Sequence, residues 1–200
     1  MSRPNAYFWS AVNRFGVQTI LLIGNILIAR QLTPDDFGLV GMLAIFIGIA
    51  MNFTDSGFSD CLIRKPNADR LDFSTILTFN IVSGMIFYLI IFFSAPLFAS
   101  YFERRELIHI ARIIGISIPI NALTLTGYTR LRKELRFKTL AIVDLTSTLL
   151  MILMVYGMAL SGMGYLALAF QSIILGTGKI LLMIIFAKWS PRFSFNWSRF

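Results

Sequence analysis

Cysteine and histidine are almost absent from this sequence, which contains one of each among 200 residues. A single cysteine cannot close an intramolecular disulfide, and one Cys with one His cannot build the usual zinc or cluster sites. We therefore expect no bound metal. The string Gly176-Thr177-Gly178-Lys179 is similar to part of a phosphate-binding loop. However, Ile173 stands where such a loop has its first glycine and Ile180 replaces its Ser or Thr, so no nucleotide cofactor is expected.

Charged residues are also scarce. They make up 14% of the chain, whereas hydrophobic residues make up 56%, with 19 phenylalanines and a mean hydropathy of +0.74. A soluble domain has roughly a quarter charged residues, so this composition argues against an ordinary cytosolic globule and favours lipid surroundings. A net charge of +8 would indicate a nucleic-acid partner in a soluble protein. Here the basic residues lie between apolar runs, so we expect membrane lipids and no nucleic acid as partners.

Long apolar runs are what the sequence has in abundance. A helix needs roughly 20 apolar residues to cross a bilayer, and six segments meet this requirement. We expect spans at about 8–28, 37–53, 76–98, 107–128, 140–160 and 165–187. The prediction is an all-α integral membrane protein, in which a six-helix bundle forms a single membrane domain over residues 1–200.

The basic residues fall mainly on one side of these spans. With the N-terminus in the cytoplasm, 12 of the 18 Lys and Arg residues lie in cytoplasmic segments and 3 on the opposite side. By the positive-inside rule this places both termini in the cytoplasm. Residues 130–138 form the most basic loop and predict a short helix at the inner surface, where anionic headgroups attract cations. The basic residues of this loop are Arg130, Arg132, Lys133, Arg136 and Lys138.

Local patterns predict where spans begin and bend. The string Thr33-Pro34-Asp35-Asp36 predicts the start of the second span, with Thr33 as its N-cap. Pro119 predicts a kink in the fourth span, because proline lacks an N–H and its ring clashes with the preceding turn. Gly176 and Gly178 suggest a bend in the last span. Tyr128 stands at a span end and fits the aromatic belt of a membrane interface.

Polar residues inside the spans are the candidate functional groups, because an ionisable group is costly in lipid unless it faces protein or water. At about 100° per residue, Arg14, Gln18 and Asn25 share an arc of about 40° on the first span. If this stripe converges with the other polar and basic residues of the spans, they line a cavity with a modest cationic excess, which favours an anionic solute. The candidate substrate-binding residues are Arg14, Gln18, Asn25, Arg112 and Lys179.

Two acidic residues oppose this positive charge. Asp144 lies in the fifth span and Asp55 at the inner end of the second. We expect them to hold the basic groups in place or to bind a coupling cation. A structural ion pair of Asp144 with Arg14 or Lys179 is an equally open alternative, since all three lie in the inner half of the membrane. Such a pair is compatible with a substrate-contacting role.

Three strings connect the sequence to a known family. They are Ala29-Arg30-Gln31-Leu32-Thr33-Pro34-Asp35-Asp36-Phe37-Gly38, then Thr54-Asp55-Ser56-Gly57, and finally Lys133-Glu134-Leu135-Arg136-Phe137. The combination resembles the polysaccharide transporter family, the O-antigen and exopolysaccharide flippases of the multidrug/oligosaccharidyl-lipid/polysaccharide superfamily. The resemblance covers nearly the whole chain. It implies a bacterial inner-membrane flippase that moves undecaprenyl-diphosphate-linked sugar repeat units by alternating access between two lobes.

The number of spans departs from that family. Its members have about twice as many spans, as a two-lobe transporter requires, so the resemblance implies the N-terminal lobe alone. We expect a fragment whose partner is a missing C-terminal lobe, and a second copy of this chain is the alternative. The implied ligand is a lipid-linked oligosaccharide with an anionic diphosphate headgroup.

Three other functions stay open at this point. A drug/cation antiporter of the same superfamily would prefer an acidic surface inside the membrane. A scaffold of polysaccharide assembly would depend on the basic 130–138 surface rather than on charges inside the spans. A glycan-modifying enzyme would depend on His109 or Asp144. The sequence shows no nucleophile elbow, zinc motif or pair of loop carboxylates, so we expect no enzymatic activity.

Overall fold

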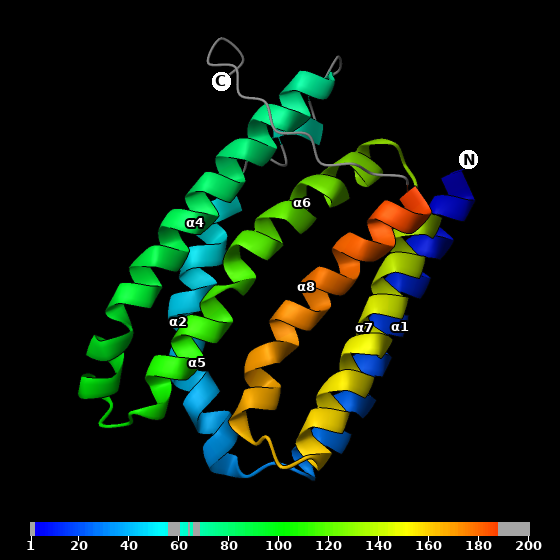
Figure 1. Cartoon of the computed structure of the whole chain (residues 1–200). Helices are drawn as coiled ribbons and strands as arrows, with labels where there is room; N and C mark the ends of the chain where they lie inside the picture. Colours follow the sequence, from blue (N-terminus) through cyan, green and yellow to red (C-terminus); the bar gives the residue numbers. More distant parts are fainter. Residues whose placement is uncertain (1–2, 56–60, 64, 66–68, 188–200) are drawn as a thin grey trace.

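The computed structural model describes residues 3–55, 61–63, 65 and 69–187, and Figure 1 shows their arrangement. These residues form helices and no strand, which confirms the all-α prediction. Six helical segments are long and apolar enough to cross a membrane, with the two helices α5 and α6 forming one segment. The helices are α1 (Arg3–Ala29), α2 (Pro34–Asp55), α4 (Arg70–Tyr101), α5 (Glu106–Gly115), α6 (Ser117–Lys133), α7 (Phe137–Leu160) and α8 (Tyr165–Ala187).

The helices form a bundle in which α1 is a peripheral member. Helix α1 packs mainly against α7, α7 packs against α8, and α4 packs against α5 and α6. In Figure 1, α4 lies on the left, the α1–α7 pair on the right, and α6 and α8 between them. One apolar core joins α2, α4 and α5, a second joins α1, α7 and α8, and a third joins α6, α7 and α8. Helices α6 and α8 therefore connect α4 and α5 on one side of the bundle with the α1–α7 pair on the other.

The fourth span is broken where Pro119 predicts a kink. Helix α5 ends at Gly115 and α6 begins at Ser117. Proline has no N–H to donate to the carbonyl of Gly115, four residues earlier, and its ring crowds that carbonyl. Helix α4 packs closely against this break. A Cβ on Gly84 of α4 would lie 3.2 Å from the Cα of Pro119. The predicted kink is confirmed.

The start of α2 is also as the sequence predicts. The Thr33 hydroxyl accepts a hydrogen bond from the backbone N–H of Asp36 at 3.3 Å, and the Asp36 carboxylate accepts one from the backbone N–H of Thr33 at 2.9 Å. This reciprocal pair is a capping box, with Asp in the place of the usual Glu. The adjacent Asp35 pairs with Arg104 at the turn between α4 and α5, with 2.9 Å between the Asp35 Oδ1 and the Arg104 Nη1. The α1–α2 turn is thereby joined to the α4–α5 turn at one end of the bundle.

The prediction of a short surface helix over residues 130–138 is wrong. Helix α6 instead runs straight to Lys133, and α7 begins at Phe137. Leu135 adopts a left-handed conformation with φ of 54°, and the N–H of Arg136 donates to the carbonyl of Leu131. This is the Schellman ending of a helix. The basic residues favour it because cations in the last turn, such as Arg132, compensate the negative helix end.

Candidate functional site

A buried carboxylate lies where four helices meet. Asp144 of α7 is 8% exposed. Its Oδ2 accepts a hydrogen bond of 2.9 Å from the amide of Asn13 on α1. Its Oδ1 accepts a hydrogen bond from the Tyr128 hydroxyl on α6 and forms an ion pair of 3.0 Å with the Lys179 ammonium on α8. We name Asn13, Tyr128, Asp144 and Lys179 the carboxylate cluster.

Two glycines lie just before Lys179 on α8, and the first of them packs closely against α6. A Cβ on Gly176 would lie 2.5 Å from a side-chain carbon of Ile120 on α6, and one on Gly178 would lie 3.5 Å from the Cβ of Ser147 on α7. Small residues let helix backbones approach closely in a membrane. Helix α8 continues without interruption through both glycines, and the bend stays a prediction. Their role is close packing, since a larger side chain would push α8 away from Ile120.

Tyr128, which the sequence assigns to the aromatic belt alone, also contacts the buried ion pair. Its hydroxyl donates to Asp144, and the Lys179 Nζ lies 5.2 Å from the centre of its ring. The ring face is negative, so it attracts the ammonium as well. Tyr128 therefore supports both charges of the pair. The sequence did not identify Asn13 and Tyr128 as site residues. Their role depends on contact with Asp144 of another helix, which no local pattern signals.

The polar stripe of α1 is exposed. Gly16 and Gly24 face α7, since a Cβ at either position would overlap the side chain of Leu145 or Ile152. Arg14, Gln18 and Asn25 lie about 100° around the helix from Gly24. All three residues are exposed, and no other side chain that the structure describes forms a hydrogen bond or ion pair with them. The bundle thus leaves this stripe, which we call the α1 polar face, uncovered.

The remaining sequence candidates lie elsewhere. Arg112 of α5 sits over the ring of Phe92 on α4, 4.3 Å from its centre, and its buried Nε has no hydrogen-bond partner among the described atoms. Helix α4 lies on the opposite side of the bundle from α1 (Figure 1). The structure therefore brings Lys179 and Asp144 together but does not bring Arg112 to the α1 polar face. Asp55 ends α2, and its side chain lies outside the described part of the chain.

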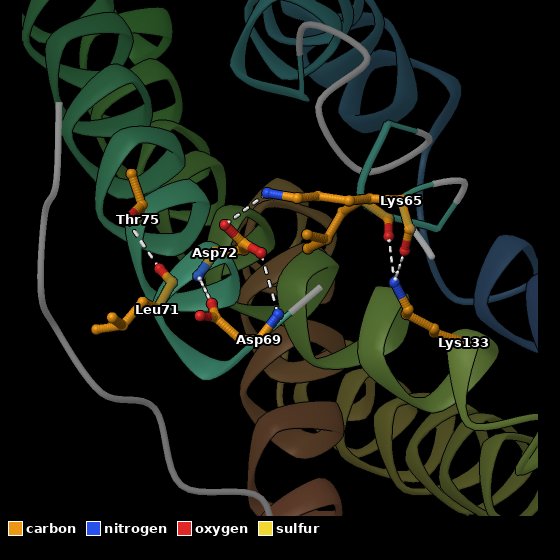
Figure 2. Close-up of polar contacts among 7 residues, drawn as sticks. Lys65, Asp69, Leu71, Asp72, Thr75 and Lys133 are labelled. Carbon is orange, nitrogen blue, oxygen red and sulfur yellow. Dashed lines mark hydrogen bonds and ion pairs between the residues drawn. The ribbon is translucent and has the colours of Figure 1, made fainter. Parts of the chain in front are cut away.

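A second polar network lies at the start of α4 (Figure 2). Asp69 and Asp72 form a capping box, and the buried Asp72 also pairs with Lys65 at 2.8 Å. Lys133, at the end of α6, donates to the backbone carbonyls of Lys65 and, at 2.9 Å, Leu62. This network holds the segment before α4 against α6. The spacing of Asp69 and Asp72 before an apolar run is a sequence signal that could have found the cap.

Two basic residues expected at the membrane surface therefore bind backbone carbonyls. Lys133 does so in the network above, and Arg136 lies 3.5 Å from the carbonyl oxygen of Ala187 at the end of α8. Cations near a helix end satisfy carbonyls that have no partner within the helix. Arg130 forms an ion pair of 2.8 Å with Glu134 on the same turn. Arg132 and Lys138 are exposed, so they stay candidates for contact with lipid headgroups.

Comparison with known proteins gives one family and several relatives. The sequence pattern of a family described as "Polysaccharide biosynthesis protein" matches residues 27–200. The chain is 27% identical to the teichuronic acid biosynthesis protein TuaB of Bacillus subtilis, over 94% of this chain and 39% of that protein. It is 20% identical to the succinoglycan biosynthesis transport protein ExoT of Rhizobium meliloti, over 96% and 39%. It is 18% identical to the lipopolysaccharide biosynthesis protein WzxC of Escherichia coli, over 70% and 29%.

The chain matches only part of the length of these relatives. The chain spans about 39% of the length of TuaB and of ExoT. That share is consistent with one lobe of a two-lobe protein, as the resemblance of the sequence implies. No solved structure matches the chain.

Proposed function

We propose, because this chain belongs to the polysaccharide biosynthesis protein family, that it forms one lobe of a bacterial inner-membrane flippase. The substrate is an undecaprenyl-diphosphate-linked oligosaccharide repeat unit. The multi-pass membrane fold and the names of the relatives, which include a biosynthesis transport protein, support a transport role in polysaccharide biosynthesis. The cargo is bound and released without any covalent bond being made or broken, so the role is not enzymatic.

The observation that best supports this proposal is the α1 polar face. An Arg at the centre of a membrane costs at least about 2.5–3.5 kcal/mol when it faces lipid. Arg14 belongs to an apolar span and is exposed with no partner in the described part of its own bundle. Water or another lobe on that side of α1 would remove the cost. The face would then line a lumen between two lobes.

The chemistry of this face suits a diphosphate. Arginine presents a planar fork of N–H donors that binds phosphate oxygens in pairs. Gln18 and Asn25 follow Arg14 along the helix over about 16 Å, and their amides supply hydrogen bonds to phosphate or sugar groups. Helix α1 contains no Asp or Glu, which argues against a cationic drug as the cargo at this face. The acyl chain of the carrier stays in lipid while the headgroup crosses.

The carboxylate cluster gives α1 its position in this mechanism. Asn13 connects α1 to Asp144, and Arg14 is the next residue along the chain. Lys179 is paired with Asp144, so it contacts substrate only if that pair opens. Alternating access would change the side on which the α1 polar face is reached, with the second lobe or a second copy closing the other side.

The test is replacement of the native gene by an Arg14→Ala variant in a host that exports the polysaccharide. We expect loss of surface polysaccharide and accumulation of lipid-linked repeat units on the inner leaflet, with a normal amount of the protein in the membrane. Arg30→Ala is the matched control, because Arg30 is exposed in the turn that follows α1. Full export by the Arg14→Ala strain would remove the α1 polar face from the mechanism.

A further inference from the structure

The geometry points to a monovalent-cation site at Asp144 that the chain fills with its own lysine. In this inference the Lys179 ammonium stands where an alkali cation such as sodium would otherwise bind. The inference concerns the carboxylate cluster and does not depend on what the α1 polar face binds.

The cluster has the oxygen atoms that such a cation requires. Hard cations take oxygen ligands, and Asp144 supplies two carboxylate oxygens while Tyr128 supplies a hydroxyl oxygen. Asn13 supplies a further one. Its Oδ1 is buried with no hydrogen-bond partner in the described structure, on the same amide group whose Nδ2 lies 2.9 Å from Asp144. The Lys179 ammonium leaves this amide oxygen without a partner in the described structure, so the oxygen stays available to a cation bound beside Asp144.

The charge of the cluster selects a monovalent ion. Asp144 is the one carboxylate in it, and no group of three His, Cys, Asp or Glu side chains that could hold a metal occurs within the described residues. One negative charge is balanced by one positive charge. A divalent ion would leave an uncompensated charge in surroundings of low dielectric.

Lys179 already supplies that positive charge. Its Nζ lies 3.0 Å from the Asp144 Oδ1 and 5.2 Å from the centre of the Tyr128 ring. Close packing of Gly176 against Ile120 brings α8 near α6 just before Lys179. The carboxylate that accepts a hydrogen bond from Asn13 of α1 is therefore neutralised by a charge built into the chain. A sodium gradient has no site at Asp144 on which to act.

The test is a gain of sodium binding when the lysine is neutralised. We would measure the melting temperature of the detergent-solubilised chain in sodium chloride and in choline chloride at equal ionic strength, from pH 7 to pH 9. The wild-type Tm should be the same in both salts. The Lys179→Met variant, whose side chain has similar length and no charge, should melt about 5 °C higher in 100 mM sodium, as expected for ligand binding to the folded state alone.

Two controls keep the outcome interpretable. The Asp144→Asn/Lys179→Met double variant should lose the sodium response, since the carboxylate is gone. Lys179→Gln is the second single variant, for use if the Met variant is not recovered from membranes. A sodium response of the wild type that Asp144→Asn abolishes would overturn the inference, because Lys179 would not be excluding the ion. Met and Gln variants that both ignore sodium across this pH range would overturn it as well.

Discussion

The Lys179 ammonium of α8 lies 3.0 Å from the Asp144 carboxylate of α7, with side chains 22% and 11% exposed. The pair occurs within two segments that are otherwise long apolar runs. Each charge is tolerated there because the other is present and because Asn13 and Tyr128 donate hydrogen bonds to the carboxylate. Removing either charge alone leaves the other without compensation.

The first prediction concerns this pair. In sodium-free buffer, Asp144→Asn and Lys179→Met should each lower the free energy of unfolding by about 3 kcal/mol, the usual cost of an uncompensated buried charge. The double variant should lose less than the sum of the two. A double-mutant cycle from denaturant titrations measures this coupling. Strictly additive losses would show that the two side chains do not interact in the folded protein.

Tyr128→Phe tests the hydrogen bond separately from the ring. The substitution keeps the ring beside Lys179 and removes the donor to Asp144, so we expect a loss of about 1.5–3 kcal/mol, typical of a hydrogen bond to a charged group. Tyr88→Phe is the matched control, because the described structure shows no hydrogen bond from the Tyr88 hydroxyl. Equal stability of the two variants in thermal denaturation would place Tyr128 back among interfacial aromatics.

The close approach of α4 to the kink predicts a steric effect at Gly84. Leucine there would have to displace the backbone of Pro119, whose Cα lies 3.2 Å from the position of a Cβ, so Gly84→Leu should cost at least about 1–3 kcal/mol through overpacking. Gly157→Leu, where no atom lies within 4 Å, should leave the melting temperature nearly unchanged. The prediction fails if the two variants melt together.

The contacts of Lys133 lead us to expect higher protease sensitivity when this residue is replaced. Lys133→Met removes the donor to the carbonyls of Leu62 and Lys65, so the segment before α4 should detach from α6. Trypsin should then cleave after Arg64 faster than in the wild type, as mass spectrometry of the fragments would show. Lys65 itself precedes a proline, at which trypsin does not cleave. Arg132→Met is the control, since Arg132 is exposed on the same turn. Unchanged cleavage would mean that the Asp72 pair alone holds this segment.

Much of the architecture follows from the sequence because it depends on local properties. Apolar runs of sufficient length predict six spans, since backbone N–H and C=O groups in lipid must be satisfied within a helix. Thr33 and Asp36 predict a cap, and Pro119 predicts a break, because each acts within four residues of itself. The surface helix at 130–138 was predicted wrongly, because the density of basic residues suggested a membrane-surface helix, whereas Leu135 ends α6 in a left-handed conformation for which the sequence gives no glycine as a signal.

The candidate site depended on contacts between helices. The sequence placed Arg14, Gln18 and Asn25 on one face of a helix, since helical periodicity alone decides that. It left open whether Arg14 or Lys179 would meet Asp144, and it gave no reason to select Asn13 or Tyr128. Only the tertiary structure decided these points, because the position of Lys179 depends on how α8 packs against α6 and α7. Spans are set by hydrophobicity along the chain, and ion pairs are set by which faces the packed helices turn toward one another.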